Sequence, residues 1–176
     1  MTDFLKTKRL TVRFTDPIHF EDILNLRSDP DVQRFTTQGP QSRQDVERFM
    51  EMILIYQQKH AHGMASVFLN DSGEFIGQAG IFHIGHYDLQ PEIEIGYRLH
   101  KRHWGKGYAT EITNALVNWG FENLDIDTIV AFVETENIAS KRVLKNCGFQ
   151  FIVLGQCHYG HLERYEVYKP EKVKKR

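Results

Sequence analysis

One stretch of the chain, residues 91–123, constrains the fold more than any other because its apolar pattern changes period part-way along. Residues 91–99 alternate polar and apolar side chains, which predicts a half-buried strand. A glycine-rich turn follows at residues 102–110, and apolar side chains then recur at helical spacing over residues 112–121. A strand that passes through such a turn into an amphipathic helix predicts an α/β fold.

The remaining segments extend this pattern over the whole chain of 176 residues. Asp16 and Pro17 begin a first amphipathic helix that ends near residues 28–30, and Ser42 with Asp45 caps a second one. Strands are predicted at residues 8–14, 65–69, 75–82, 91–99, 128–133, 149–157 and 162–168, with a short helix at 137–146. We expect one domain over residues 1–176, with a mixed, mostly antiparallel sheet of about seven strands flanked by about four helices.

The charge balance and the apolar pattern exclude several classes of protein. With 22 basic and 23 acidic residues the chain is almost neutral, which disfavours nucleic acid or an anionic membrane as a partner. No signal peptide and no apolar run of about 18 residues is present. Two cysteines, Cys147 and Cys157, fit a reducing compartment, so we expect a cytoplasmic protein. The basic residues at 169–176 are interpreted as a frayed tail.

The glycine-rich turn has the composition of an anion-binding loop. The first turn of a helix offers backbone N–H groups that have no partner within the helix, and glycine allows a ligand to approach them closely. Gly105 and Gly107 lie where the strand meets the helix, and Arg102 and Lys106 flank them with positive charge. We therefore expect a diphosphate to bind at this junction.

The spacing of this turn differs from that of two other phosphate-binding motifs. A Walker loop requires four residues between its first glycine and a Gly-Lys-Ser/Thr end, and this spacing is absent. A dinucleotide fingerprint requires a third glycine at position 110, where Thr110 stands. The glycines could also serve only to turn the chain, an alternative that local composition leaves open.

The sequence resembles the GNAT superfamily of N-acetyltransferases. Residues 102–107 match its pattern of Arg or Gln, two residues, Gly, one residue, and Gly or Ala. Residues 95–97, 104–111 and 137–140 resemble more narrowly the branch that contains the ribosomal-protein N-terminal acetyltransferases. Further resemblance to this branch is found at residues 8–10 and 28–30.

This resemblance implies a binding site for acetyl-CoA. In the family, the cofactor lies where two central strands of the sheet splay apart, with its pyrophosphate on the loop and its pantetheine beside the preceding strand. The residues that the resemblance implies for cofactor binding are Tyr97, Arg98, Leu99, Arg102, Trp104, Gly105, Lys106, Gly107, Tyr108, Ala109, Thr110 and Asn137. Asn is also among the best helix N-caps, so a purely structural role for Asn137 stays open.

Transfer of an acetyl group to an amine requires a neutral amine and a stabilised thiolate. Glu94 occupies the family position before Ile-Gly-Tyr and is the expected base, with substrate anchoring or pairing to Arg98 as the alternative. The tyrosine acid of many relatives is replaced here by Leu144. The resemblance instead places Ser140 near the sulfur, where its hydroxyl would donate a hydrogen bond. Backbone N–H groups near Ile95 would polarise the acetyl carbonyl.

The predicted acceptor is an α-amino group of a protein or peptide, attacked directly in a ternary complex. Neutralising an α-amine at pH 7 costs roughly 1 kcal/mol, against roughly 5 kcal/mol for lysine, and a carboxylate base favours the easier amine. Glu92 and Glu94 would also attract polyamines, aminoglycosides or amino acids, which are the alternatives. A non-catalytic acyl-CoA-binding module and a nucleotide-binding protein are the other classes considered. A homodimer is one option that the family resemblance suggests.

The remaining candidate residues are interpreted as structural. The histidine pairs at 83 and 86 and at 158 and 161 have no accompanying Cys or carboxylate framework, so no metal ligand set is predicted. Cys147 is expected to be a buried residue at a helix end. Trp104, Trp119 and Phe121 are expected to pack against the core.

Overall fold

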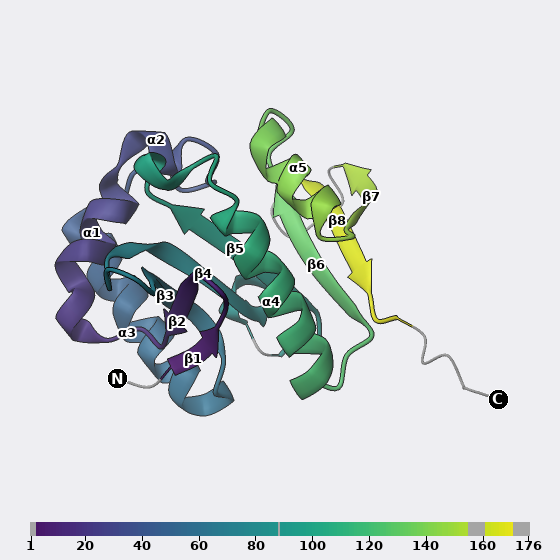
Figure 1. The fold of residues 1–176 in the computed structure, drawn as a ribbon, viewed down its shortest axis with the longest axis horizontal. Helices are drawn as coiled ribbons and strands as arrows, with labels where there is room; N and C mark the ends of the chain where they lie inside the picture. Colours follow the sequence, from purple (N-terminus) through teal and green to yellow (C-terminus); the bar gives the residue numbers. More distant parts are fainter. Residues whose placement is uncertain (1–2, 88, 155–160, 171–176) are drawn as a thin grey trace.

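The computed structural model describes residues 3–87, 89–154 and 161–170, which form one eight-stranded sheet with helices on both faces (Figure 1). In space the strands follow the order β1-β2-β3-β4-β5-β6-β8-β7. Their bounds are β1 (Asp3–Lys6), β2 (Leu10–Arg13), β3 (Gly63–Leu69), β4 (Phe75–His83), β5 (Ile93–Leu99), β6 (Thr128–Val133), β7 (Gln150–Leu154) and β8 (Glu163–Tyr168). All neighbouring strands are antiparallel except β5 and β6.

The parallel strands β5 and β6 at the centre of the sheet pair over a very short length. The register between β5 and β6 consists of Glu94 opposite Val130, whereas β4 and β5 pair along seven positions. Beyond Glu94 the two strands diverge, and Figure 1 shows β5 and β6 separating towards the carboxyl end of β5. The expected splay in the middle of the sheet is therefore present.

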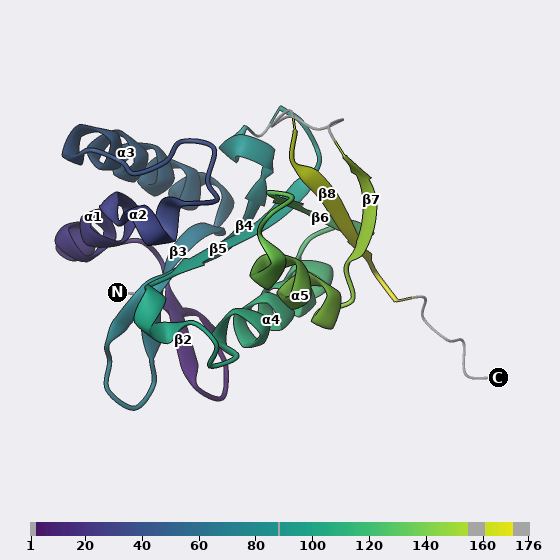
Figure 2. The ribbon, with the colours of Figure 1, turned by 90° about the horizontal axis from the view of Figure 1, so that it is seen from above.

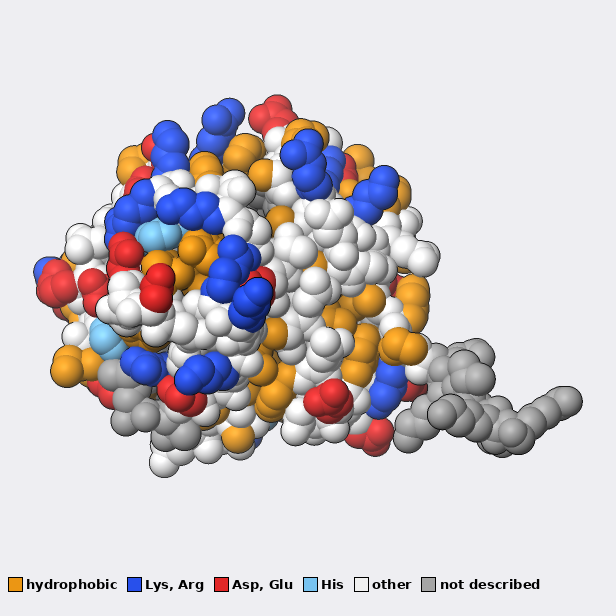
Figure 3. Space-filling view, viewed as in Figure 1, with side chains coloured by type: hydrophobic (Ala, Val, Ile, Leu, Met, Phe, Trp, Pro, Cys, Tyr) orange, Lys and Arg blue, Asp and Glu red, His pale blue; other side chains and the backbone are white. Residues whose placement is uncertain are grey.

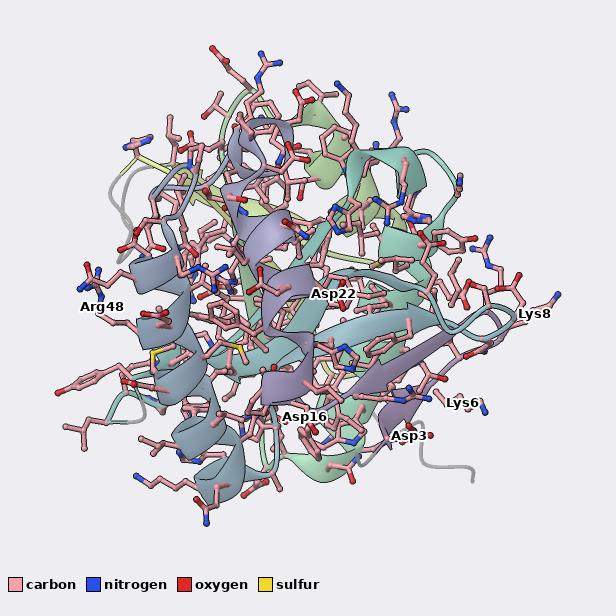
Figure 4. The ribbon with its side chains drawn as sticks, turned by 90° about the vertical axis from the view of Figure 1, so that its left-hand side faces the viewer. Asp3, Lys6, Lys8, Asp16, Asp22 and Arg48 are labelled. Atoms are coloured by element: carbon pink, nitrogen blue, oxygen red, sulfur yellow. The ribbon has the colours of Figure 1, made fainter. Side chains whose placement is uncertain are left out.

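The helices are divided between the two faces of the sheet. Figure 2 shows α1, α2 and α3 on one face and α4 and α5 on the other. Figure 4 views the first of these faces, with α1 and α3 across the strands and Arg48 pointing outwards from α3. The helix bounds are α1 (Phe20–Ser28), α2 (Pro30–Gln33), α3 (Arg43–His60), α4 (Tyr108–Asn123) and α5 (Ile138–Asn146), with short 3-10 turns at η1 (Pro17–His19), η2 (Ile84–His86) and η3 (Lys101–His103).

Local sequence signals explain where α3 begins and ends. The Ser42 hydroxyl accepts from the Asp45 N–H while the Asp45 carboxylate accepts from the Ser42 N–H, which completes a capping box. Ala61 ends the helix in the left-handed conformation, with φ 55° and ψ 23°, and its N–H donates to the Gln57 carbonyl. The chain therefore reverses directly after His60.

The main hydrophobic core lies between the sheet and α4. Its fully buried side chains come from the central strands and from the inner face of the helix, among them Ile76, Ile81, Ile112, Leu116 and Ile129. Gly120 lets α4 approach the sheet closely, since a Cβ at that position would lie 2.5 Å from Ile81 Cδ1. This packing holds α4 against the central strands of the sheet.

The predicted fold class is confirmed, with two additional elements. The sheet has eight strands because Asp3–Lys6 forms β1 and pairs with β2, and these four residues show no alternation by which a strand could be recognised in the sequence. The fifth helix is α2, a single turn that Asp29 caps by accepting from the Asp31 N–H. Within the described residues, no helix is long and apolar enough to cross a membrane.

Candidate active site

The loop between β5 and α4 adopts a conformation that depends on its two glycines. Gly105 has φ 72° and Gly107 has φ 80°, in the left-handed region that side-chain-bearing residues avoid. A Cβ added to Gly105 would meet no atom within 4 Å. The backbone at Gly105 therefore borders open space that a ligand can enter.

The start of α4 leaves its first N–H groups available. Gly107 is the N-cap and, having no side chain, provides no side-chain cap, in contrast to the capping box of α3. The first intrahelical bond runs from the Glu111 N–H to the Gly107 carbonyl at 3.0 Å. The N–H groups of Tyr108, Ala109 and Thr110 thus precede the helical ladder and point, with the positive end of the helix dipole, out of the helix start. This is the arrangement that binds a phosphate.

Arg9, a residue that sequence reasoning did not select, braces this loop from the β1–β2 turn. Its Nη1 donates to the Lys106 carbonyl at 2.9 Å, its Nε donates to Glu111 at 2.6 Å, and its guanidinium lies 4.5 Å from the centre of the Tyr108 ring. Glu111 also accepts from the Thr7 hydroxyl at 2.6 Å. The only sequence signal for this brace was the resemblance at residues 8–10.

The cationic side chains near the loop differ in their contacts and exposure. Arg102 donates to Glu74 at 2.9 and 3.1 Å, so its charge is directed at that carboxylate. Lys106 is exposed, and Figure 3 shows Lys and Arg side chains over the surface around the start of α4. Trp104 was expected to be packed, yet the residue is 47% exposed, and its Nε1 donates to the Leu99 carbonyl at 2.7 Å.

Strand β5 directs its side chains alternately to the two faces of the sheet. The Tyr97 hydroxyl reaches Ser140 on α5, whereas the Arg98 guanidinium donates to Gln33 on α2 at 2.9 Å. Glu94 shares the face of Arg98, because the two positions are four apart along the strand. The expected base therefore lies on the α1–α3 face and Tyr97 on the α4–α5 face, at the point where β5 and β6 part.

On the α4–α5 face, two hydroxyl groups meet at the start of α5. The Tyr97 and Ser140 oxygens lie 3.1 Å apart. Asn137 is the N-cap, and its side-chain oxygen accepts from the Ser140 N–H at 3.1 Å, so the structural role considered for this residue is present. Burial is the largest influence on Tyr97 and raises its pKa to about 12, which keeps the phenol protonated at neutral pH.

A match to a family model now identifies the fold. Residues 9–150 match the model described as "Acetyltransferase (GNAT) domain". The chain belongs to the GNAT family. A curated relative, the "Uncharacterized N-acetyltransferase p20" of Bacillus licheniformis, is 33% identical over 149 residues, covering 83% of this chain and 82% of that protein.

Solved GNAT structures share the fold over almost the whole chain. The acetyltransferase from Agrobacterium tumefaciens str. C58 has a TM-score of 0.83 at 29% identity, covering 96% of this chain and 95% of that one. The RimL ribosomal L7/L12 alpha-N-protein acetyltransferase in complex with coenzyme A has a TM-score of 0.78 at 17% identity, with 95% and 98% coverage. Spermidine N-acetyltransferase from Vibrio cholerae, in complex with CoA and spermine, has 0.75 at 19% identity, with 92% and 96% coverage.

The chain is thus an acetyl-CoA-dependent GNAT acetyltransferase that transfers the acetyl group to an amine. The predicted fold, enzyme class and cosubstrate are confirmed. The roles of the individual side chains stay predictions that the geometry refines.

Three predicted contributions are altered by that geometry. Arg98 and Leu99 were expected to flank pantetheine, but the Arg98 side chain points to α2 and Leu99 is 4% exposed in the core, which leaves their backbone for the cofactor. Burial lowers the pKa of Arg98 to about 10. Glu92, expected to line a cationic site with Glu94, forms an ion pair with Arg164 on β8.

His86 lies on the same face of the sheet as Glu94, and the sequence indicated no role for it there. The His86 ring stacks on Phe82, with centroids 4.2 Å apart and planes within 8°. Phe82 is the cross-strand partner of Glu94, so the imidazole lies on the same side of the sheet. Burial, followed by the nearby charges of Arg27 and Arg98, lowers the pKa of His86 to about 4, and within the described part of the chain its buried Nε2 has no hydrogen-bond partner.

Two further regions lie outside this constellation. A pocket of about 420 Å³ at the start of α3 contains none of the predicted site residues and does not define the site; it is lined by Gln38, Pro40, Gln41, Asp45, Arg48, Phe49 and Met52. Cys147 is buried at the end of α5, and desolvation raises its pKa to about 11, as expected of a structural thiol. Cys157 and His158 lie outside the described residues.

Proposed function

We propose that this enzyme acetylates the α-amino group of a protein or peptide, by direct attack on acetyl-CoA in a ternary complex. The observation that carries the proposal is the placement of Glu94 and of the Tyr97–Ser140 pair on opposite faces of β5, where β5 and β6 part. An amine can then approach the acetyl carbon from the α1–α3 face while the sulfur leaves towards the α4–α5 face.

The cofactor is held by the loop and by β5. Its pyrophosphate lies on the N–H groups of Tyr108, Ala109 and Thr110, next to Gly105 and Lys106. Its pantetheine runs along the edge of β5 that no longer pairs with β6. The thioester then lies between Glu94 and Tyr97.

The proton and electron balance assigns one role to each group. Glu94 takes a proton from the ammonium, directly or through a water, and the neutral nitrogen attacks the thioester carbon. The tetrahedral oxyanion accepts hydrogen bonds from backbone N–H groups of β5. Its collapse breaks the C–S bond, and hydrogen bonds from Tyr97 and Ser140 stabilise the leaving thiolate, because the high pKa of Tyr97 keeps its phenol proton available. The amide nitrogen loses its remaining extra proton, and the thiolate takes up one proton to leave as the CoA thiol.

Two arguments support an α-amino acceptor. A carboxylate base is far better matched to an α-amine than to a lysine, whose neutralisation at pH 7 costs roughly 5 kcal/mol. The RimL structure, whose name describes an alpha-N-protein acetyltransferase, shares this fold. We infer that the chain belongs to the same branch, consistent with the resemblance at residues 95–97 and 137–140.

A polyamine is the second candidate. The spermidine N-acetyltransferase also shares this fold, and Glu94 would attract a cation. The ion pair between Glu92 and Arg164 weakens this alternative, because it compensates one of the two carboxylates that a polycation would use.

The test is thiol release from acetyl-CoA with a panel of peptides that have a free N-terminus, matched peptides with a blocked N-terminus and a free lysine, polyamines and aminoglycosides. We expect the highest kcat/KM for a free N-terminus. A higher kcat/KM for spermidine than for every peptide would contradict the proposed acceptor but not the acetyltransferase chemistry. The expectation of a homodimer is tested separately by light scattering after size-exclusion chromatography.

A further inference from the structure

Three histidines that are spread over 24 positions of the sequence meet at the end of the sheet where β3 begins and β4 ends. His60 is the last residue of α3, His62 precedes β3, and His83 is the last residue of β4. The centroids of the three rings lie 5.1 to 5.8 Å apart. Each ring offers a nitrogen such that all three atoms lie within 4.8 Å of one another.

The end of α3 explains how two of these rings become neighbours. Ala61 adopts φ 55°, a left-handed conformation that residues with a Cβ rarely adopt. The chain turns back at this residue, so that His60 and His62 face the same space instead of opposite directions. Antiparallel pairing of β3 with β4 then brings His83 to them.

Two of the rings are oriented through Nδ1. His62 Nδ1 lies 2.9 Å from the Ile81 carbonyl oxygen, a contact in which the ring nitrogen must be the donor. His83 Nδ1 lies 2.6 Å from the Tyr56 hydroxyl. Metal-binding histidines commonly donate one ring N–H to a carbonyl or other acceptor, which fixes the tautomer and leaves the second nitrogen to the metal.

We propose that His60, His62 and His83 form a binding site for a divalent transition-metal ion of the zinc class. Imidazole nitrogen suits Zn²⁺, Ni²⁺ and Cu²⁺, and three histidines with one open position are an established zinc ligand set. Coordination at 2.0–2.1 Å holds tetrahedral ligand nitrogens about 3.3 Å apart, so the rings draw together by side-chain rotation. No metal site was expected because the pair His83 and His86 lacks an accompanying Cys or carboxylate framework in the sequence, whereas the fold brings His83 to His60 and His62.

The bound ion would join three segments near the face from which the amine is proposed to approach. It would tie the end of α3 to the start of β3 and the end of β4. His83 pairs with Ile93, which immediately precedes Glu94 on β5. The ion therefore stabilises the strand end next to the proposed base, without taking part in acetyl transfer.

The test is direct metal binding to the full chain without a polyhistidine tag, after treatment with EDTA and dialysis. Isothermal titration with ZnCl₂ is expected to show one ion per chain with a Kd in the micromolar range or below. X-ray absorption at the zinc edge is expected to show three imidazole ligands. Wild-type protein that binds no Zn²⁺ at micromolar concentration, or whose bound zinc has fewer than three imidazoles, would overturn the proposal without bearing on the acetyltransferase activity.

Variants identify the ligands. His60→Gln, His62→Gln and His83→Gln are each expected to weaken Zn²⁺ binding by more than about tenfold, since loss of an outer-shell partner alone typically costs 10- to 100-fold. His161→Gln is the matched control, because that ring is 77% exposed and lies beside Glu134 on another part of the surface. Circular dichroism of each metal-free variant reports whether it folds, and the half-buried His60 and His83 keep the test valid if the His62 variant does not. Equal loss of affinity in His161→Gln would also overturn the proposal.

Discussion

The hydroxyl oxygens of Tyr97 and Ser140 lie 3.1 Å apart although the residues are 43 positions apart and belong to β5 and α5. The contact joins β5 to the start of α5 on the α4–α5 face of the sheet. It places a phenol, whose pKa burial raises to about 12, next to the serine that the family resemblance assigned to the thiolate. In the proposed mechanism two hydroxyl groups, and not one, therefore donate to the leaving sulfur.

Removing the phenol hydroxyl should slow transfer without weakening cofactor binding. We expect Tyr97→Phe to lower kcat by up to about tenfold, the equivalent of one hydrogen bond of about 1.4 kcal/mol, and to leave the Kd of CoA unchanged. Ser140→Ala should have a smaller effect, and the double variant should be less than additive because the two groups are in contact. Tyr168→Phe, outside the site, is the control. Full turnover in Tyr97→Phe would show that the phenol does not assist the sulfur.

The glycines of the loop should be needed for CoA affinity beyond their effect on stability. Gly105→Ala forces a Cβ into a left-handed position, with a cost of about 1–2 kcal/mol, and places it in the open space beside the backbone. We expect CoA affinity to fall by about tenfold or more, a loss of about 1.4 kcal/mol. Gly39→Ala is the matched control, since Gly39 has φ 64° and equally open surroundings. Similar CoA affinities in the two variants would argue against a pyrophosphate at Gly105.

The brace formed by Glu111 should make stability depend on pH. Burial opposes ionisation of Glu111, but hydrogen bonds from Thr7 and Arg9 outweigh it, so the pKa lies below its ordinary value of 4.5. A carboxylate with a lowered pKa stabilises the fold above the unfolded-state pKa, and this contribution is lost as pH falls through the folded-state pKa. Wild type should therefore melt at a higher temperature than Glu111→Gln at pH 7, and the difference should shrink below pH 4.5.

The control for this comparison is Glu122→Gln, which removes the same charge from an exposed position of α4. It should change the melting temperature little at either pH. A difference between wild type and Glu111→Gln that stays constant from pH 7 down to acid unfolding would show that the carboxylate charge is not what braces the loop.

Cys147 should react slowly with thiol reagents. Burial raises its pKa to about 11, and at pH 8 such a thiol is ionised to about one part in a thousand. In a Cys157→Ser variant, labelling by iodoacetamide is expected to accelerate only when the protein is unfolded by denaturant. Rapid labelling of the folded variant would contradict the buried position of Cys147.

The sequence was sufficient to predict the elements whose signals are local. Three such features are present: the strand and glycine turn before α4, the capping box of Ser42 and Asp45, and the order of helices and strands along the chain. The signal for each element lies within a single segment of the sequence. The short strand β1 was missed because its four residues, Asp3–Lys6, do not alternate between polar and apolar side chains. Its existence depends on pairing with β2, which is a tertiary property.

The sequence predicted only the part of the site that lies on β5 and on the loop between β5 and α4. Side-chain contacts between distant elements were not: Arg9 with Glu111, Arg102 with Glu74 and Tyr97 with Ser140 each join segments at least 28 positions apart. With leucine at position 144, the sequence assigned the sulfur to Ser140 alone and gave Tyr97 a cofactor-binding role, whereas the structure brings their two hydroxyl groups together. Spacing along a chain cannot reveal a contact that depends on the direction in which a strand presents its side chains.

The central claim is that Glu94 accepts the proton of the attacking amine, and one measurement tests it most directly. Turnover with the best amine and the Kd of CoA are compared for wild type, Glu94→Gln and the control Glu92→Gln, whose carboxylate is paired with Arg164. Glu94→Gln is expected to lower kcat by about a hundredfold or more, with an unchanged Kd of CoA, because a general base contributes about 10²–10⁴ in rate. Glu92→Gln is expected to change kcat little. Wild-type turnover in Glu94→Gln would show that Glu94 is not the base.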